Sequence, residues 1–109
     1  MADHTYDASK QGDIDKFNID LGTRLRNFKK EFASEFLDRV RARTPVLTGA
    51  LQNGWGYDMK QESINVWNIK EYAAYVEYGT PKMAPRRMLA VTLLEAEQIA
   101  EIAKQRSEK

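Results

Sequence analysis

Apolar residues in the first part of the chain recur at intervals of three or four positions. They are Ile14, Phe17, Leu21, Leu25, Phe28, Phe32, Phe36 and Val40. This spacing places side chains on one face of an α-helix, so we predict a single long helix that begins at Asp13, a residue able to cap it. Gly22 weakens the pattern without ending it. The helix is expected to end before Pro45, because the residue that precedes a proline disfavours helical dihedrals.

The predicted helix is long for a chain of this size. About 30 residues at 1.5 Å each make a rod of roughly 45 Å. The radius of gyration expected for a domain of this length gives a diameter of only about 26 Å. The aromatic stripe of such a helix would extend beyond its own domain. We therefore expect Phe28 and Phe32 to contact a second copy of the chain or another protein.

After Pro45 the apolar positions alternate instead. Trp55, Tyr57 and Met59 are separated by glycine or aspartate, which is typical of a strand with one packed face. Residues 60–63 are polar and predict a turn, and the apolar residues of 64–69 predict a second strand. An antiparallel hairpin is the simplest connection between the two strands.

The last third of the chain predicts two further helices. Residues 72–80 fit either a short helix or a strand, and we favour a helix that Gly79 and Pro81 end. A proline loop follows. From Arg87 onward, apolar residues return at intervals of 4, 3, 4 and 3 and predict a C-terminal helix.

These elements predict an α+β fold, in which a long N-terminal helix and a C-terminal helix pack on a small antiparallel β-sheet. Residues 1–12 contain few apolar side chains and are expected to form a flexible N-terminal arm. Residues 13–109 are expected to form a single domain, because a chain of this length has no room for a second core.

Composition narrows the class of protein. Hydrophobic residues make up 42% of the chain and charged residues 30%, as in ordinary globular domains. The chain has no cysteine, which excludes disulfides and thiolate chemistry. No apolar run approaches the roughly 20 residues needed to cross a membrane, and the polar N-terminus does not look like a signal peptide. We therefore expect a soluble protein made in the cytoplasm, with no membrane partner.

The charge is nearly balanced overall but segregated along the chain. The net charge is +1. Residues 1–20 hold five Asp against two Lys, a net charge of −3, whereas residues 21–45 hold seven Lys or Arg against three acids, a net charge of +4. Such segregation usually marks solvated faces, and it can also mark charged surfaces that meet a partner.

Candidate catalytic residues are few. The single histidine, His4, lies on the predicted arm with no fixed partner, and no pair of metal ligands has the spacing of a zinc site. Asp58 with Glu62 and Glu71 with Glu77 could each be drawn as an acid and a base, but exposed surface carboxylates are the simpler interpretation. We predict no catalytic residue, no cofactor and no metal, and we do not expect an enzyme.

Two basic clusters leave a nucleic-acid interpretation open. The first ends the predicted long helix and comprises Arg39, Arg41 and Arg43; the second, in the proline loop, comprises Lys82, Arg86 and Arg87. Arginine clusters bind phosphate. Basic residues at a helix C-terminus are also explained by the helix dipole, which accounts for the first cluster without a ligand.

Two segments resemble a known family. TPVLTGALQNGW (residues 44–55) follows the predicted long helix, and YAAYVEYGTPKMAPRRML (residues 72–89) opens the last helix. In this order and separation they resemble the head–tail joining and tail-completion proteins of long-tailed bacteriophages, over roughly residues 20 to 100. The chain departs from the family pattern at Arg87, where a proline is common, and at Met88, where an aromatic residue is common.

The resemblance implies a virion structural protein of the phage neck. Such a protein would form a homo-oligomeric ring, six- or twelve-fold, that joins or completes the tail at the head–tail interface. Its partners would be neighbouring neck, connector or tail-tube proteins and the passing DNA, which is not recognised by sequence. The alternative is a small DNA-binding module or another phage assembly module.

The residues expected to contact a copy or a neck partner come from the aromatic stripe and the two family segments. Thr48, Gly49, Glu77, Gly79, Thr80 and Arg86 occupy the positions of the family's signature residues. The three tyrosines suit either the edge of a core or a subunit interface, and Glu77 could pair with Arg86 if the loop folds back. The full set is Phe28, Phe32, Thr48, Gly49, Tyr72, Tyr75, Glu77, Tyr78, Gly79, Thr80, Arg86 and Arg87.

Overall fold

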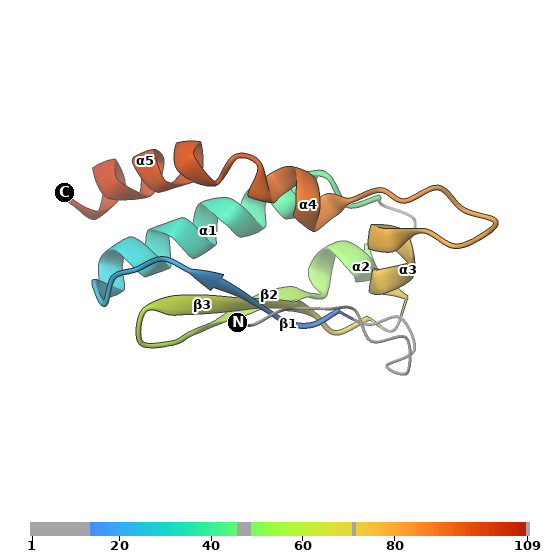
Figure 1. Cartoon of the computed structure of the whole chain (residues 1–109), viewed down its shortest axis with the longest axis horizontal. Helices are drawn as coiled ribbons and strands as arrows, with labels where there is room; N and C mark the ends of the chain where they lie inside the picture. Colours follow the sequence, from blue (N-terminus) through green and yellow to red (C-terminus); the bar gives the residue numbers. More distant parts are fainter. Residues whose placement is uncertain (1–13, 46–48, 71, 109) are drawn as a thin grey trace.

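The computed structural model describes residues 14–45, 49–70 and 72–108 and shows helices packed on a small antiparallel sheet (Figure 1). The predicted α+β class is confirmed. The elements in chain order are β1 (Ile14–Asp20), α1 (Arg26–Ala42), α2 (Ala50–Asn53), β2 (Trp55–Met59), β3 (Ser63–Asn68), α3 (Ala73–Tyr78), α4 (Met88–Leu93) and α5 (Ala96–Ser107).

The sheet has three strands in the order β1-β3-β2, and both pairings are antiparallel. The predicted hairpin of β2 and β3 is confirmed, with Tyr57 opposite Val66. The ammonium group of the buried Lys29 on α1 donates to the carbonyl oxygens of Lys60 and Gln61 in the hairpin turn, at 2.6 and 2.8 Å. The tip of the hairpin is thereby attached to the helix.

The prediction of one helix from residue 13 to Pro45 is wrong in its first part. Residues 14–20 form β1, in which Phe17 lies opposite Val66 and Ile19 opposite Ile64 of β3. Gly22 has a φ of 66°, in the left-handed region that favours glycine, and α1 begins only at Arg26. The helix has 17 residues, a length of about 26 Å. Asp13, the expected cap, lies outside the described residues.

The α1 helix is the middle layer of the molecule, with the sheet on one side and α4 and α5 on the other (Figure 1). Phe32 and Phe36 are 1% and 0% exposed and stack with ring centroids 6.1 Å apart. The domain therefore covers most of the aromatic stripe by itself. The argument that an over-long helix requires a partner does not hold.

The C-terminal residues form two helices rather than the single predicted one. A turn at Leu94 and Glu95 separates α4 from α5. The helix predicted within residues 72–80 is confirmed as α3.

A glycine shapes the outer face of the sheet, which points away from α1. Gly56 lies opposite Trp67 in the register of β2 and β3. A Cβ atom at residue 56 would overlap the indole ring of Trp67, so glycine is needed for the ring to lie over β2.

Candidate functional site

Segments far apart in the sequence meet at one end of the molecule and form an apolar groove of about 500 Å³. The turn after α1, the short helix α2, α3 and the loop between α3 and α4 all contribute to it. We call it the tyrosine groove. Its lining residues are Pro45, Leu51, Tyr72, Tyr75, Val76, Thr80, Met83 and Arg86.

The position of the tyrosines follows from the pattern of α3. Small Ala73 and Ala74 face inward and are 0% exposed, so the helix packs closely on the domain. The tyrosines lie three residues apart on the other side. Tyr72, Tyr75 and Tyr78 are 36%, 40% and 44% exposed. They therefore belong to the surface rather than to the core.

Glu77 holds α3 to the start of α4. Its carboxylate is 2% exposed and accepts hydrogen bonds from the backbone N–H groups of Leu89 at 2.7 Å and Ala90 at 3.1 Å. It caps α4, whose own N-cap residue provides no side-chain hydrogen bond. Burial raises the pKa of Glu77 above its ordinary value, against the opposing effect of the Leu89 and Ala90 N–H groups.

Glu77 does not form the ion pair with Arg86 that the sequence left open, and its carboxylate is not solvated either. The Glu77 carboxylate is bound by backbone N–H groups, and Arg86 contributes its own backbone N–H to the carbonyl oxygen of Val76 at 2.8 Å. The next N–H, that of Arg87, donates to the Glu77 carbonyl oxygen at 3.1 Å. The loop does fold back, and backbone hydrogen bonds close it.

The segment Gly79-Thr80 shapes the loop that borders the groove. Gly79 has a φ of 80°, and a Cβ atom there would lie 2.8 Å from the carbonyl oxygen of Met83. Thr80 and Met83 exchange backbone hydrogen bonds of 2.9 and 3.1 Å. This tight loop brings Met83, 39% exposed, to the edge of the groove.

Arg87 is the one non-glycine residue with a positive φ in the part of the chain that the structure describes, at 50°. Proline has a φ fixed near −65° and cannot adopt this conformation. The backbone conformation at residue 87 is therefore one that the proline common at this position in the family could not adopt.

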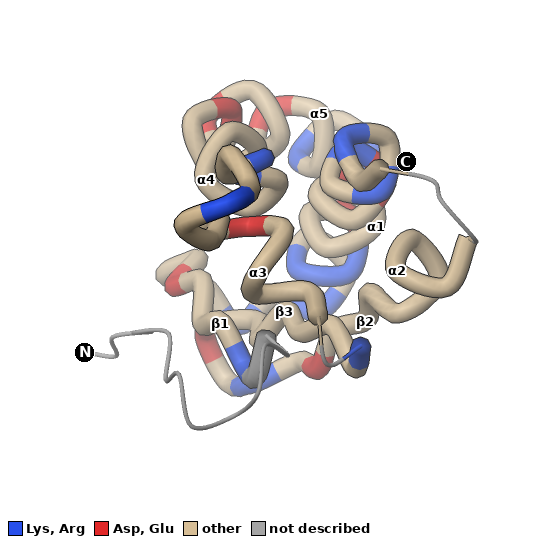
Figure 2. The backbone as a smooth tube through the Cα atoms, turned by 90° about the vertical axis from the view of Figure 1, so that its right-hand side faces the viewer, with Lys and Arg blue, Asp and Glu red and all other residues tan. Residues whose placement is uncertain are grey.

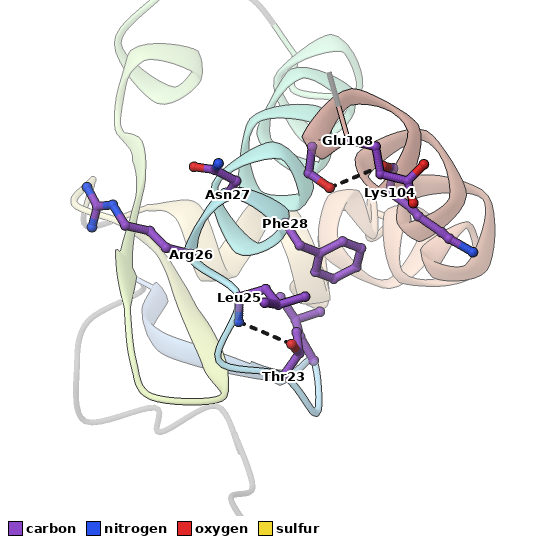
Figure 3. Close-up of a pocket in the computed structure, with 9 residues that line it drawn as sticks. Thr23, Leu25, Arg26, Asn27, Phe28, Lys104 and Glu108 are labelled. Atoms are coloured by element: carbon purple, nitrogen blue, oxygen red, sulfur yellow. Dashed lines mark hydrogen bonds between the residues drawn. The ribbon is translucent and has the colours of Figure 1, made fainter.

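A second apolar groove, of about 620 Å³, lies where α1 begins and α5 ends. We call it the helix-end groove. Figure 3 shows Phe28 and Leu25 beside Lys104, in the last turn of α5, and Glu108, which directly follows this helix. Leu25 is 68% exposed. The elements that line the two grooves lie at opposite ends of the long axis of the molecule (Figure 1), which measures 46 Å.

The remaining predicted residues lie elsewhere. Phe32 is in the core and its side chain does not reach the surface; its ring centroid lies 6.3 Å from that of Phe28. Gly49 precedes α2 with a φ of 82°. Thr48 lies outside the described residues. Pro45, Leu51 and Met83 line the tyrosine groove but were not predicted, because no sequence pattern links positions so far apart.

The basic cluster at the end of α1 is engaged within the domain. Arg39 donates to Glu35 at 2.8 Å and to Glu95 at 2.9 Å, and Arg43 donates to Glu95 at 2.6 and 3.0 Å. Two of the three arginines therefore hold the turn between α4 and α5 against α1. This arrangement leaves Lys82, Arg86 and Arg87 as the more exposed cluster.

Acid is expected to weaken this junction. Hydrogen bonds from Arg43 and then Arg39 lower the pKa of Glu95 from 4.5 to about 2. A carboxyl whose pKa is lower in the folded state stabilises the fold above its unfolded pKa, and this contribution is lost as the pH falls toward 2. Replacing Glu95 with glutamine is expected to lower the free energy of unfolding at pH 7 and to flatten its decline between pH 5 and pH 2.

Chemical denaturation at a series of pH values measures this effect. The matched control is Glu101→Gln on the exposed side of α5, which should keep the wild-type dependence on pH. Equal slopes for wild type and Glu95→Gln would show that the two arginines do not stabilise the fold through this carboxylate.

Within residues 14–45, 49–70 and 72–108, no group of three or more His, Cys, Asp or Glu side chains could hold a metal ion. No helix in the same ranges is long and apolar enough to span a membrane.

Fold and surface together define a small α+β domain that exposes an aromatic groove at one end and a second apolar groove at the other. Residues 15–79 match the family model described as "Bacteriophage HK97-gp10, putative tail-component". The match covers more than half of the chain, and the chain belongs to this family of bacteriophage tail components. It includes the first of the two family segments and the first eight residues of the second, YAAYVEYG, which confirms the resemblance. No curated protein and no solved structure matches the chain.

Proposed function

We propose that the chain is a structural protein of the phage neck that joins or completes the tail at the head–tail interface. In this role it acts as a closed six- or twelve-fold ring around the DNA passage. Membership of a tail-component family is the observation that carries the proposal. The protein is made in the host cytoplasm and becomes part of the virion, where it contacts neighbouring neck, connector or tail-tube proteins and passes DNA without reading its sequence.

The two grooves support a ring of identical copies. A ring built head to tail needs two different surfaces on each copy, because each interface joins unlike patches. The tyrosine groove and the helix-end groove are two such surfaces, at opposite ends of the long axis (Figure 1). Tyrosines suit interfaces because they combine a large apolar area with a polar hydroxyl group.

Removing the gene from the phage tests the proposal. We expect full heads and complete tails that do not join, and infectivity restored by the wild-type protein supplied in trans. Tyr75→Glu, which places a charge in the tyrosine groove, is expected to restore infectivity at least tenfold less well. Ser34→Glu, on the exposed face of α1, is the matched control and should restore it fully. Joined, infectious particles without the protein would refute the proposal.

A DNA-binding module is the second candidate. The exposed cations Lys82, Arg86 and Arg87 favour it. Such a module would bind duplex DNA with an affinity that falls steeply with salt concentration. An absence of binding at low salt would remove this candidate.

A further inference from the structure

The rim of the tyrosine groove is positively charged. Lys82, Arg86 and Arg87 are exposed in the loop that borders it, and the sequence has no Asp or Glu between Gly79 and Leu94. Figure 2 looks onto this end of the molecule and shows basic segments in the loop between α3 and α4. The acidic residue of α3, Glu77, is buried and occupied in capping α4. An occupant of the groove should therefore combine apolar groups with negative charge.

The first 13 residues have this composition. They contain Asp3, Asp7 and Asp13 against one lysine, Lys10, and no arginine, and Tyr6 lies between Asp3 and Asp7 in the sequence. An aromatic anchor flanked by acids complements an apolar groove with a basic rim. The chain thus carries a segment of suitable chemistry outside its described part.

This segment starts close to the groove. Ile14, the first described residue, pairs with Asn68 of β3, and the Asn68 side-chain amide donates to the carbonyl oxygen of Leu51 at 2.9 Å. Leu51 lines the tyrosine groove. Thirteen residues can span up to about 45 Å when extended, which is ample for the short path from Ile14 to the groove.

We propose that the acidic N-terminal arm, residues 1–13, docks into the tyrosine groove of its own chain. Tyr6 enters between the apolar walls, and Asp3 and Asp7 lie at Arg86 and Lys82. The arm of the same chain is the occupant because a short tether gives it an effective concentration in the millimolar range, above that of any free partner. The arm then covers the groove in the free subunit, and a neighbour must displace it. Only this last consequence rests on the proposed function.

Photo-crosslinking of the purified full-length protein tests the docking. A photoreactive benzoylphenylalanine replaces Tyr6, and the protein is irradiated at about 0.15 M salt, where exposed charges more than about 8 Å apart are largely screened. We expect adducts of monomer mass whose crosslinked peptides lie within residues 72–86. Arg86→Glu and Lys82→Glu should each lower the yield of these adducts at least fivefold. Lys30→Glu, the same charge reversal on the exposed face of α1, should leave the yield unchanged.

Three results would overturn the docking: adducts on another surface, adducts that join two chains, or a yield that neither groove variant lowers. Adducts that join two chains would mean that the arm reaches a neighbouring copy instead. The experiment uses purified protein without particles, so its outcome is independent of whether heads and tails join. A negative result here would leave the proposed neck function intact, and a failure of that function would leave the docking intact.

Discussion

Replacing Phe32 with alanine is expected to lower the free energy of unfolding by about 3–5 kcal/mol. The ring is 1% exposed and lies between Phe28 and Phe36 in the core that joins α1 to the sheet. Truncation removes its burial and leaves a cavity that the surrounding strands and helices fill only in part. Domains of this size are stable by about 5–15 kcal/mol, so the variant should lose a large part of its stability. Urea denaturation measures the change.

Phe28→Ala is the matched control on the same helix face. Phe28 is only partly buried, at the edge of the helix-end groove, and less apolar surface returns to water when it is truncated. We expect a loss smaller than that of Phe32→Ala. A loss at Phe32 no larger than that at Phe28 would mean that the aromatic stripe is not the core of the domain.

Replacing Glu77 with alanine is expected to destabilise the domain by about 2–4 kcal/mol. The change removes both acceptors from the N–H groups of Leu89 and Ala90 at the start of α4. An unsatisfied buried donor costs about 1–3 kcal/mol, which applies in full to the buried Leu89 N–H. The Ala90 N–H is only partly buried and adds a smaller loss. Thermal and urea denaturation of the purified variant measure the change.

Glu77→Gln provides the graded comparison, because its amide keeps one acceptor oxygen, and it should lose about half as much. Glu101→Ala, at an exposed position of α5, is expected to stay within about 0.5 kcal/mol of wild type. If Glu77→Ala were as stable as Glu101→Ala, the carboxylate would not be the cap that holds α4 to α3.

The sequence pattern predicted the β2–β3 hairpin and α3 correctly, but it predicted a helix at residues 14–20, where the structure has β1. The irregular pairing of β1 explains this error. The pairing of β1 with β3 shifts register between Ile14 and Phe17. This irregularity interrupts the alternation of apolar and polar residues that marks a strand. Ile14 and Phe17 are three positions apart, so they fit the three- and four-residue spacing of the apolar residues in α1. Gly22 was interpreted as a tolerated glycine within a helix, whereas its positive φ marks the turn into α1.

The break between α4 and α5 left no local mark on the sequence either. Neither glycine nor proline occurs from Met88 to Ser107, and the apolar spacing runs through the turn. The turn residue Glu95 is bound by Arg39 of α1 and by Arg43, which directly follows this helix. Contacts of this kind come from distant parts of the chain and cannot be deduced from a single-sequence pattern.

For the candidate site, composition indicated the tyrosines but could not show what surrounds them. Tyrosine suits an apolar surface that remains in contact with water. Tyr72 and Tyr75 lie on such a surface, the tyrosine groove. Glu77 has the residue type of an exposed carboxylate, and only the return of the chain at Leu89 shows that it is a buried cap.

The two tryptophans lie on opposite faces of the sheet, since Trp55 is opposite Asn68 and Trp67 is opposite Gly56. Trp55 is 4% exposed and donates its indole N–H to the Thr44 hydroxyl at 2.9 Å, whereas Trp67 is half-buried. Intrinsic fluorescence therefore contains two separable signals. Emission from Trp55 is expected to report melting of the interior, and emission from Trp67 would change if another protein covered the outer face. Variants with one indole each would follow folding and association independently, without an added dye.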